Sequence, residues 1–148
     1  LDKAELITHE ELATKADECC EDPSMMNIKL PRGQFESCYF PIVQSGGNYD
    51  IRPSASTNNN NLSDDVIIVS LGARYNFHCA NMARTFFVDP VPKIETIYNI
   101  LLDLRRECLS VMLEGDCIKS VAEAGVNFIR QKHHDLLQYL PKTFGFGL

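Results

Sequence analysis

The chain has 148 residues, of which 45% are hydrophobic, and it carries a formal net charge of −6 at pH 7. This length is sufficient for one domain with its own core, and nothing in the composition indicates a second domain. The acidic balance argues against a phosphate-binding surface, because nucleic-acid modules present clustered Lys and Arg. No apolar run approaches the roughly 20 residues of a membrane span. We therefore expect neither direct nucleic-acid binding nor membrane insertion.

The first predicted element is a helix over residues 9–20. Thr8 and Glu11 have the spacing of a capping box, in which each side chain accepts a hydrogen bond from the other residue's backbone amide. Pro23 follows where a helix cannot continue. A connector over 25–36 then leads to a strand at about 38–43.

The polar segment 54–63 contains four consecutive asparagines and predicts a surface loop, because such side chains compete for backbone hydrogen bonds and bury no apolar area. A low-complexity interaction tract is the alternative. Two strands follow, at about 65–73 and 82–88, each with an apolar run rich in β-branched or aromatic residues. Gly72 permits a turn or a close backbone approach within this antiparallel pair.

Two helices are predicted in the last third of the chain, at about 92–113 and 118–132. Both show apolar residues at the three-and-four spacing of one helical face. Gly115 is a plausible stop for the first of them. A short helical stretch over 134–140 ends before Pro141.

The six cysteines form no CxxC pair, and their spacings fit no zinc template. We expect free thiols in a reducing compartment. Three of them, Cys79, Cys108 and Cys117, fall inside apolar patterns, where a thiol acts as a small hydrophobe. His78 has no second ligand at metal spacing, so it is interpreted as a partly exposed strand residue.

Ser70 and Asn81 are the candidate site residues of the predicted hairpin. Ser70 lies near the end of the first strand, and Asn81 enters the second strand eleven residues later. If the register allows, the two side chains converge on one face of the hairpin. Neither side chain carries a charge.

This arrangement resembles the metallopeptidases of the aminopeptidase P and methionine aminopeptidase family, which have the pita-bread fold. In active members both matching positions are metal-binding aspartates. The segment 143–148 is similar to a glycine-histidine-glycine element of the family, with Phe146 at the position of the ligand histidine. Ser54 stands at the position of a substrate-contacting histidine. The resemblance therefore implies a degenerate site with altered residues at four functional positions.

A hard divalent ion needs anionic oxygen ligands, and phenylalanine has no lone pair to donate. We therefore expect no catalysis, no metal and no cofactor at Ser70, Asn81 and Phe146. The alternative is an active metallo-aminopeptidase with substituted ligands, aided by two glutamates that the family carries beyond the position of Leu148. The sequence assigns no residue to catalysis or to histone contact.

Four further segments are similar to one branch of this family, the N-terminal peptidase-like domains of the large subunits of the histone chaperone FACT; they are 40–49, 53–56, 70–75 and 79–85. The resemblance implies a nuclear, chromosomal module that binds histones and acts in nucleosome disassembly and reassembly during transcription, replication and repair. It also implies that a smaller HMG-type subunit is bound through other domains of the full-length protein. A domain that only anchors other modules is a third possibility.

The expected fold is α/β (α+β), with residues 1–148 forming a partial peptidase-like domain: the first half-repeat of the pita-bread fold and the start of the second. A fragment of this kind leaves apolar surface or a strand edge without its partner repeat. We therefore expect it to be marginally stable when isolated.

Overall fold

The computed structural model describes residues 6–29, 33–52, 54–64 and 66–141. The chain divides into two compact units, Leu1–Pro90 and Val91–Leu148, whereas the length had suggested one core. The first unit contains α1 (His9–Glu21), the 3-10 helix η1 (Pro23–Met26), β1 (Phe35–Gln44), β2 (Val66–Tyr75) and β3 (His78–Phe87). The second contains α2 (Pro92–Ser110), α3 (Ile118–Lys132) and the 3-10 helix η2 (His134–Tyr139).

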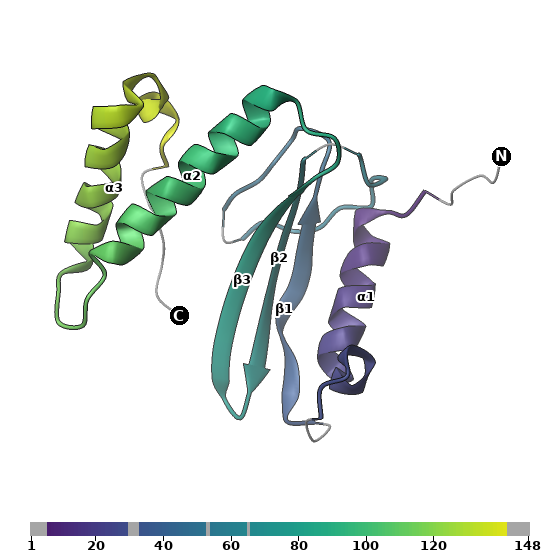
Figure 1. Ribbon diagram of the computed structural model, residues 1–148. Helices are drawn as coiled ribbons and strands as arrows, with labels where there is room; N and C mark the ends of the chain where they lie inside the picture. The colour runs from purple at the N-terminus through teal and green to yellow at the C-terminus, as the bar shows by residue number, and fades with distance from the viewer. Residues whose placement is uncertain (1–5, 30–32, 53, 65, 142–148) are drawn as a thin grey trace. The chain divides into compact units, whose positions relative to one another are not determined.

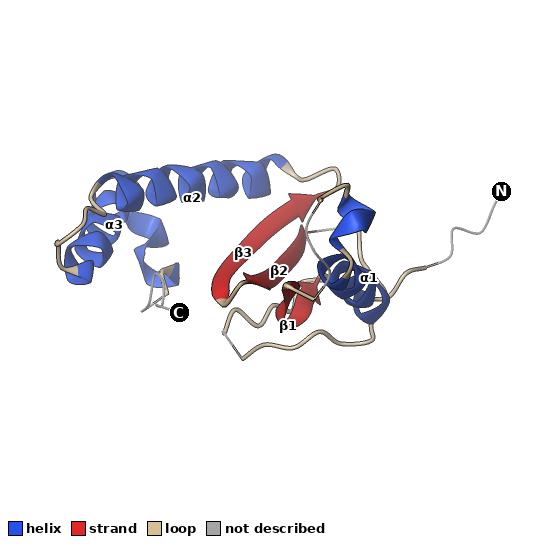
Figure 2. Ribbon diagram, turned by 90° about the horizontal axis from the view of Figure 1, so that it is seen from below, coloured by secondary structure: helices blue, strands red, loops and turns tan. Residues whose placement is uncertain are grey.

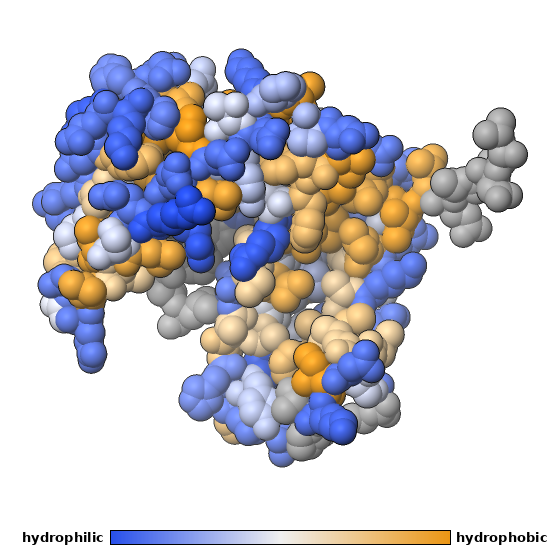
Figure 3. Space-filling view, in the orientation of Figure 1, coloured by the Kyte–Doolittle hydropathy of each residue, from blue (hydrophilic) through white to orange (hydrophobic). Residues whose placement is uncertain are grey.

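The three strands form one antiparallel sheet in the order β1–β2–β3, and α1 packs against β1 (Figure 1, Figure 2). The strands are longer than the sequence predicts at the hairpin end, where β2 runs to Tyr75 and β3 begins at His78. Ladder hydrogen bonds extend a strand as far as its partner reaches, regardless of local propensity. Figure 3 shows hydrophobic residues gathered on one face of this unit beside the start of α1.

Helix α1 begins with the capping box that its sequence predicts. The Thr8 hydroxyl accepts from the backbone amide of Glu11 at 3.2 Å, and the Glu11 carboxylate accepts from the amide of Thr8 at 2.8 Å. The buried positions of the helix are His9, Ala13 and Cys20. This spacing of four and seven residues lies on one helical face, so the same face packs on the sheet unit.

His9 is only 1% exposed and joins three segments that are distant in the sequence. Its Nδ1 lies 2.8 Å from Oδ1 of Asn58, and its Nε2 lies 2.7 Å from Oγ of Ser45. Asn58 Oδ1 is an acceptor, so Nδ1 carries a proton and donates to it. The asparagine run is therefore not a solvated loop alone, because its exposed Asn58 supplies a hydrogen-bond partner to the buried His9 at the start of α1.

The backbone of the asparagine loop also contacts the residues around the α1 N-terminus. The amide of His9 donates to the carbonyl of Asn60 at 2.9 Å, the amide of Leu62 donates to Ile7, and Thr8 forms an isolated bridge with Asn61. These bonds satisfy backbone groups that a free loop would leave to water. Residues 54–63 are thus a loop, as predicted, but part of this loop is hydrogen-bonded to residues 7–9 at the start of α1.

In the second unit, α2 and α3 pack against each other, and α3 contacts η2. The buried face of α3 consists of Val121, Gly125 and Ile129, at the four-residue spacing of a helical stripe. Helix α2 ends at Ser110, a few residues earlier than its apolar pattern predicts, and Gly115 follows with a φ of +90°. No helix within the described ranges has the length and hydropathy needed to cross a membrane.

Candidate functional site

The register of the β2–β3 hairpin decides how Ser70 and Asn81 lie. Ser70 pairs with Ala83, and Asn81 pairs with Gly72, so the two site residues are diagonal neighbours rather than direct partners. Residues paired across antiparallel strands share a face, and so do residues two apart on one strand. Ser70 and Asn81 therefore point to the same face of the sheet.

Their side chains come together on the hydroxyl of a third residue, Tyr39 in β1. The phenol oxygen lies 2.9 Å from Oγ of Ser70 and also donates a hydrogen bond to Oδ1 of Asn81. A phenol has one proton, so the bond to Asn81 uses it and the Ser70 hydroxyl is the donor in the other bond. The three groups form a neutral hydrogen-bonded cluster in which the Tyr39 phenol lies between the two positions that the resemblance assigns to metal ligands.

Gly72 provides the space that Tyr39 needs to reach this position. Tyr39 pairs with Gly72 across β1 and β2, next to an irregularity where β1 takes two residues for one in β2. A Cβ atom on Gly72 would lie 2.7 Å from Cε1 of Tyr39 and 3.2 Å from Cβ of Cys38. A real Cβ atom essentially never lies 2.7 Å from another heavy atom, so any side chain at position 72 would clash with the ring. The Tyr39 ring therefore crosses β2 at Gly72, the one residue of that strand without a side chain.

The donor set does not suit a divalent cation. Its oxygens belong to a hydroxyl, an amide and a phenol, all of them neutral, and the phenol is hydrogen-bonded to each of the other two. Mg²⁺, Mn²⁺ or Zn²⁺ sites rely on carboxylate, imidazole or thiolate ligands. Among the described residues, no group of three or more His, Cys, Asp or Glu side chains is placed to hold a metal ion. Tyr39, Ser70 and Asn81 therefore provide no ligand set for the metal-dependent hydrolysis of the fold family.

The other positions that the sequence singled out lie apart from this cluster or outside the described residues. Phe146 falls in the segment 142–148, which the structure does not describe. Ser54 is exposed, in a turn where the amide of Ala55 donates to the carbonyl of Arg52 at 3.0 Å. Arg52 also pairs with Asp50, with Nη2 2.6 Å from Oδ2, and this hydrogen-bonded cation lowers the pKa of the Asp50 carboxyl to about 2.

Cys38 and Cys79 flank the cluster on the same face, and their placement corrects one prediction. Cys79 and Cys117 were expected to be small buried hydrophobes, but both are exposed, whereas Cys108 is half-buried. Cys79 lies in β3, an edge strand of the described sheet, in which every residue from His78 to Arg84 is exposed whichever face it points to. Partial burial and a hydrogen bond with Cys79 raise the pKa of the Cys38 thiol.

Tyr39 is the functional residue that the sequence interpretation missed. It was taken only as part of an apolar strand. The family resemblance matches single positions of the sequence, so it singles out Ser70 and Asn81 as positions of metal ligands. It does not show which side chain fills the space between them. Only the register of β1 on β2 brings Tyr39 opposite Gly72 and within reach of Ser70 and Asn81.

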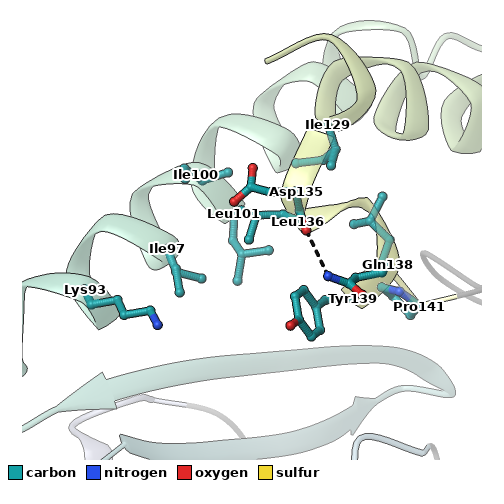
Figure 4. Close-up of a pocket in the computed structure, with 11 residues that line it drawn as sticks. Lys93, Ile97, Ile100, Leu101, Ile129, Asp135, Leu136, Gln138, Tyr139 and Pro141 are labelled. Carbon is teal, nitrogen blue, oxygen red and sulfur yellow. Dashed lines mark hydrogen bonds between the residues drawn. The ribbon is translucent and has the colours of Figure 1, made fainter. Parts of the chain in front are cut away.

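Apart from this cluster, a hollow lies wholly within the second unit (Figure 4). Its volume is about 600 Å³, and apolar side chains from α2, α3 and η2 form most of its wall. Lys93, Asp135 and Gln138 are polar members of the lining, and Gln138 donates to the backbone carbonyl of Asp135 at 3.3 Å. The polar members are few, so the wall of this hollow is mainly apolar.

The fold and the hairpin define a peptidase-like domain with the pita-bread α/β fold. Residues 3–148 match metallopeptidase family M24, and the chain belongs to this family. The X-Pro aminopeptidase of Thermotoga maritima superposes with a TM-score of 0.70 at 22% identity, over 86% of this chain and 34% of that one. At this identity the likeness shows the fold alone, and the fold predicted from the sequence is confirmed.

The more similar proteins are FACT subunits, as the sequence motifs predict. The FACT complex subunit SPT16 of Debaryomyces hansenii is 45% identical over 111 residues, covering 74% of this chain and 11% of that protein. The N-terminal domain of FACT complex subunit SPT16 from chickpea, Cicer arietinum, superposes with a TM-score of 0.91 at 34% identity. That match covers 96% of this chain and 34% of the chickpea domain. The chain thus corresponds to part of an SPT16-type N-terminal domain and spans a small share of its full-length relatives.

Proposed function

We propose that this chain is a non-catalytic, histone-binding part of a FACT complex subunit. In this role it acts in the nucleus, on chromatin, where the complex takes nucleosomes apart and reassembles them during transcription, replication and repair. A smaller HMG-type subunit joins the complex through other parts of the full-length protein. The chain needs no cofactor for this function.

The observation that carries the non-catalytic assignment is the neutral cluster of Tyr39, Ser70 and Asn81. Hydrolysis in the peptidase relatives of this fold requires a metal-activated water, and the activation depends on a cation held by anionic ligands. The positions that resemble those ligands supply no charge, and the phenol of Tyr39 occupies the space between them. A water molecule bound here would meet neither a Lewis acid nor a general base.

Charge supports a basic partner. The chain has 20 acidic and 14 basic side chains. Helix α1 concentrates acidic residues on its solvent side, where Glu10, Glu11 and Glu18 line a shallow hollow of about 510 Å³ together with Lys15 and Asn59. A surface of this sign accelerates encounter with basic proteins and repels nucleic acid.

Two assays on the full-length protein test the proposal. Incubation with Mn²⁺ or Co²⁺ and a panel of X-Pro and Met-X peptides should give no turnover. Immobilised core histones should retain the protein, and retention should fall as salt rises, because charge-based contacts are screened. Turnover that a chelator abolishes would establish the substituted-ligand peptidase instead. Absence of histone retention at both low and moderate salt would leave a domain that only anchors other modules.

A further inference from the structure

The turn between β2 and β3 presents an aromatic side chain in an unusual way. Tyr75 pairs with His78, so Asn76 and Phe77 alone make the loop at the end of the hairpin (Figure 1). Both have positive φ, +45° for Asn76 and +69° for Phe77. Two-residue hairpin loops with this backbone are type I′ turns, which strongly favour Asn followed by Gly. Phe77 occupies the position where glycine is preferred.

A phenylalanine is unfavourable at this position for two separate reasons. The left-handed conformation brings its Cβ close to the backbone, and a bulky residue there is a genuine outlier. The side chain is also 92% exposed, so burial does not repay this strain within the first unit. Strained residues of this kind are characteristic of binding sites, where the surrounding structure holds them in place for a partner.

Two hydrogen bonds hold the backbone of the turn, while its aromatic ring is exposed. The amide of Asn76 donates to the carbonyl of Gln34 at 3.2 Å, which ties the tip to the start of β1. The Asn76 carbonyl lies 3.0 Å from Nδ1 of His78. A side chain on a preorganised turn loses little freedom when it binds, so more of its contact energy appears as affinity.

We propose that Phe77 is an aromatic anchor that inserts into an apolar pocket on a basic protein partner. The inference rests on the proposed function, and the partner is the histone complex named there. Among the described residues of β1 and β2 near the tip, Glu36 and Arg74 are charged, and they form an ion pair with a nitrogen–oxygen distance of 2.6 Å. The net charge of −6 attracts a basic protein and repels phosphates and anionic lipid headgroups. Charge thus brings the partner close, and the phenyl ring supplies the contact that excludes water.

The test compares substitutions that separate strain from contact. Phe77→Gly and Phe77→Asn both relieve the backbone and both remove the ring. In the full-length protein, each should leave the thermal midpoint equal to or above that of the wild type and weaken binding to purified core histones about 10-fold or more. Phe77→Tyr should keep affinity within about 3-fold, since it keeps the ring. Ile118→Ala, at a side chain that is 75% exposed in the second unit, is the matched control and should change nothing.

Salt dependence provides a second readout. Removing an uncharged ring should lower affinity equally at every salt concentration, so the slope of log Kd against log salt stays as in the wild type. If the wild type binds histones and Phe77→Gly binds equally well, the anchor is refuted while the proposed function stands. If Phe77→Gly loses binding together with a lower thermal midpoint, Phe77 packs within its own protein and the anchor is again refuted. A wild type that does not bind histones refutes the proposed function first.

Discussion

Replacing Gly72 by alanine tests whether the Tyr39 ring needs the space above Gly72 to reach Ser70 and Asn81. The new Cβ would lie 2.7 Å from Cε1 and 3.3 Å from Cδ1 of the Tyr39 ring. The ring is not the free end of a flexible side chain, because its hydroxyl is bonded to both Ser70 and Asn81. It must therefore either leave the cluster or remain and be overpacked.

Both responses destabilise the sheet by a similar amount. Leaving the cluster breaks two hydrogen bonds, each contributing about 1 kcal/mol net. Remaining in place costs about 1–3 kcal/mol of overpacking. Alanine regains about 0.5–1 kcal/mol over glycine through the lower entropy of the unfolded chain. The expected loss in the free energy of unfolding for Gly72→Ala is thus about 1–2 kcal/mol.

A double-mutant cycle with Tyr39→Ala, measured by urea denaturation followed by circular dichroism, isolates this contact. Once the ring is absent, the remaining close contact with Cβ of Cys38, at 3.2 Å, offsets the about 0.5–1 kcal/mol that alanine regains. Gly72→Ala should then cost close to nothing, which gives a coupling energy of about 1–2 kcal/mol. Gly115→Ala is the control: its φ of +90° makes it strained, but no atom lies within 4 Å of the added Cβ, so it should not couple to Tyr39. Additive effects of Gly72→Ala and Tyr39→Ala would refute the steric argument.

Two further predictions follow from the first unit. His9→Ala should lower the free energy of unfolding by about 2–4 kcal/mol, because it leaves a cavity and removes the partner of Ser45 and Asn58 at a buried site; urea denaturation measures this, and a loss below about 1 kcal/mol would contradict it. The Asp50 carboxyl should titrate at a pKa of about 2 in a carbon-detected NMR titration, against an ordinary value of 3.8. This depressed pKa means that the pair's stabilising effect is present above pH 3.8 and is lost as the pH falls through about 2. Arg52→Ala should return the pKa toward 3.8, and an unchanged value would show that Arg52 is not its cause.

The elements that could be read from the sequence are those with a local physical signal. The capping box at Thr8 and Glu11, the apolar stripe of α3 and the β-branched run of β2 all act over a few residues, so one segment is enough to recognise them. The absence of charge on Ser70 and Asn81 was equally readable, because it concerns the chemistry of single side chains, and the match of these positions to metal ligands stays a prediction from the resemblance. The family membership rests on the same positions and on the segments around them.

Contacts between segments that are distant in the chain could not be predicted from the sequence. The burial of His9 between Ser45 and Asn58 was not expected, because the asparagine run has no apolar pattern from which docking could be inferred. The exposure of Cys79 was missed for a related reason: the sequence does not show that β3 is an edge strand, whose residues around Cys79 are exposed on both faces.

By itself, the sequence determined that Ser70 and Asn81 carry no charge, since residue type alone sets whether an oxygen is anionic. That metal ligands once stood at these two positions is what the family resemblance implies. The tertiary structure decided which side chain lies between them. Tyr39 reaches Ser70 and Asn81 because β1 pairs with β2 in one register, beside an irregularity and opposite a glycine. Register is a property of two strands packed together, so no single stretch of residues contains it.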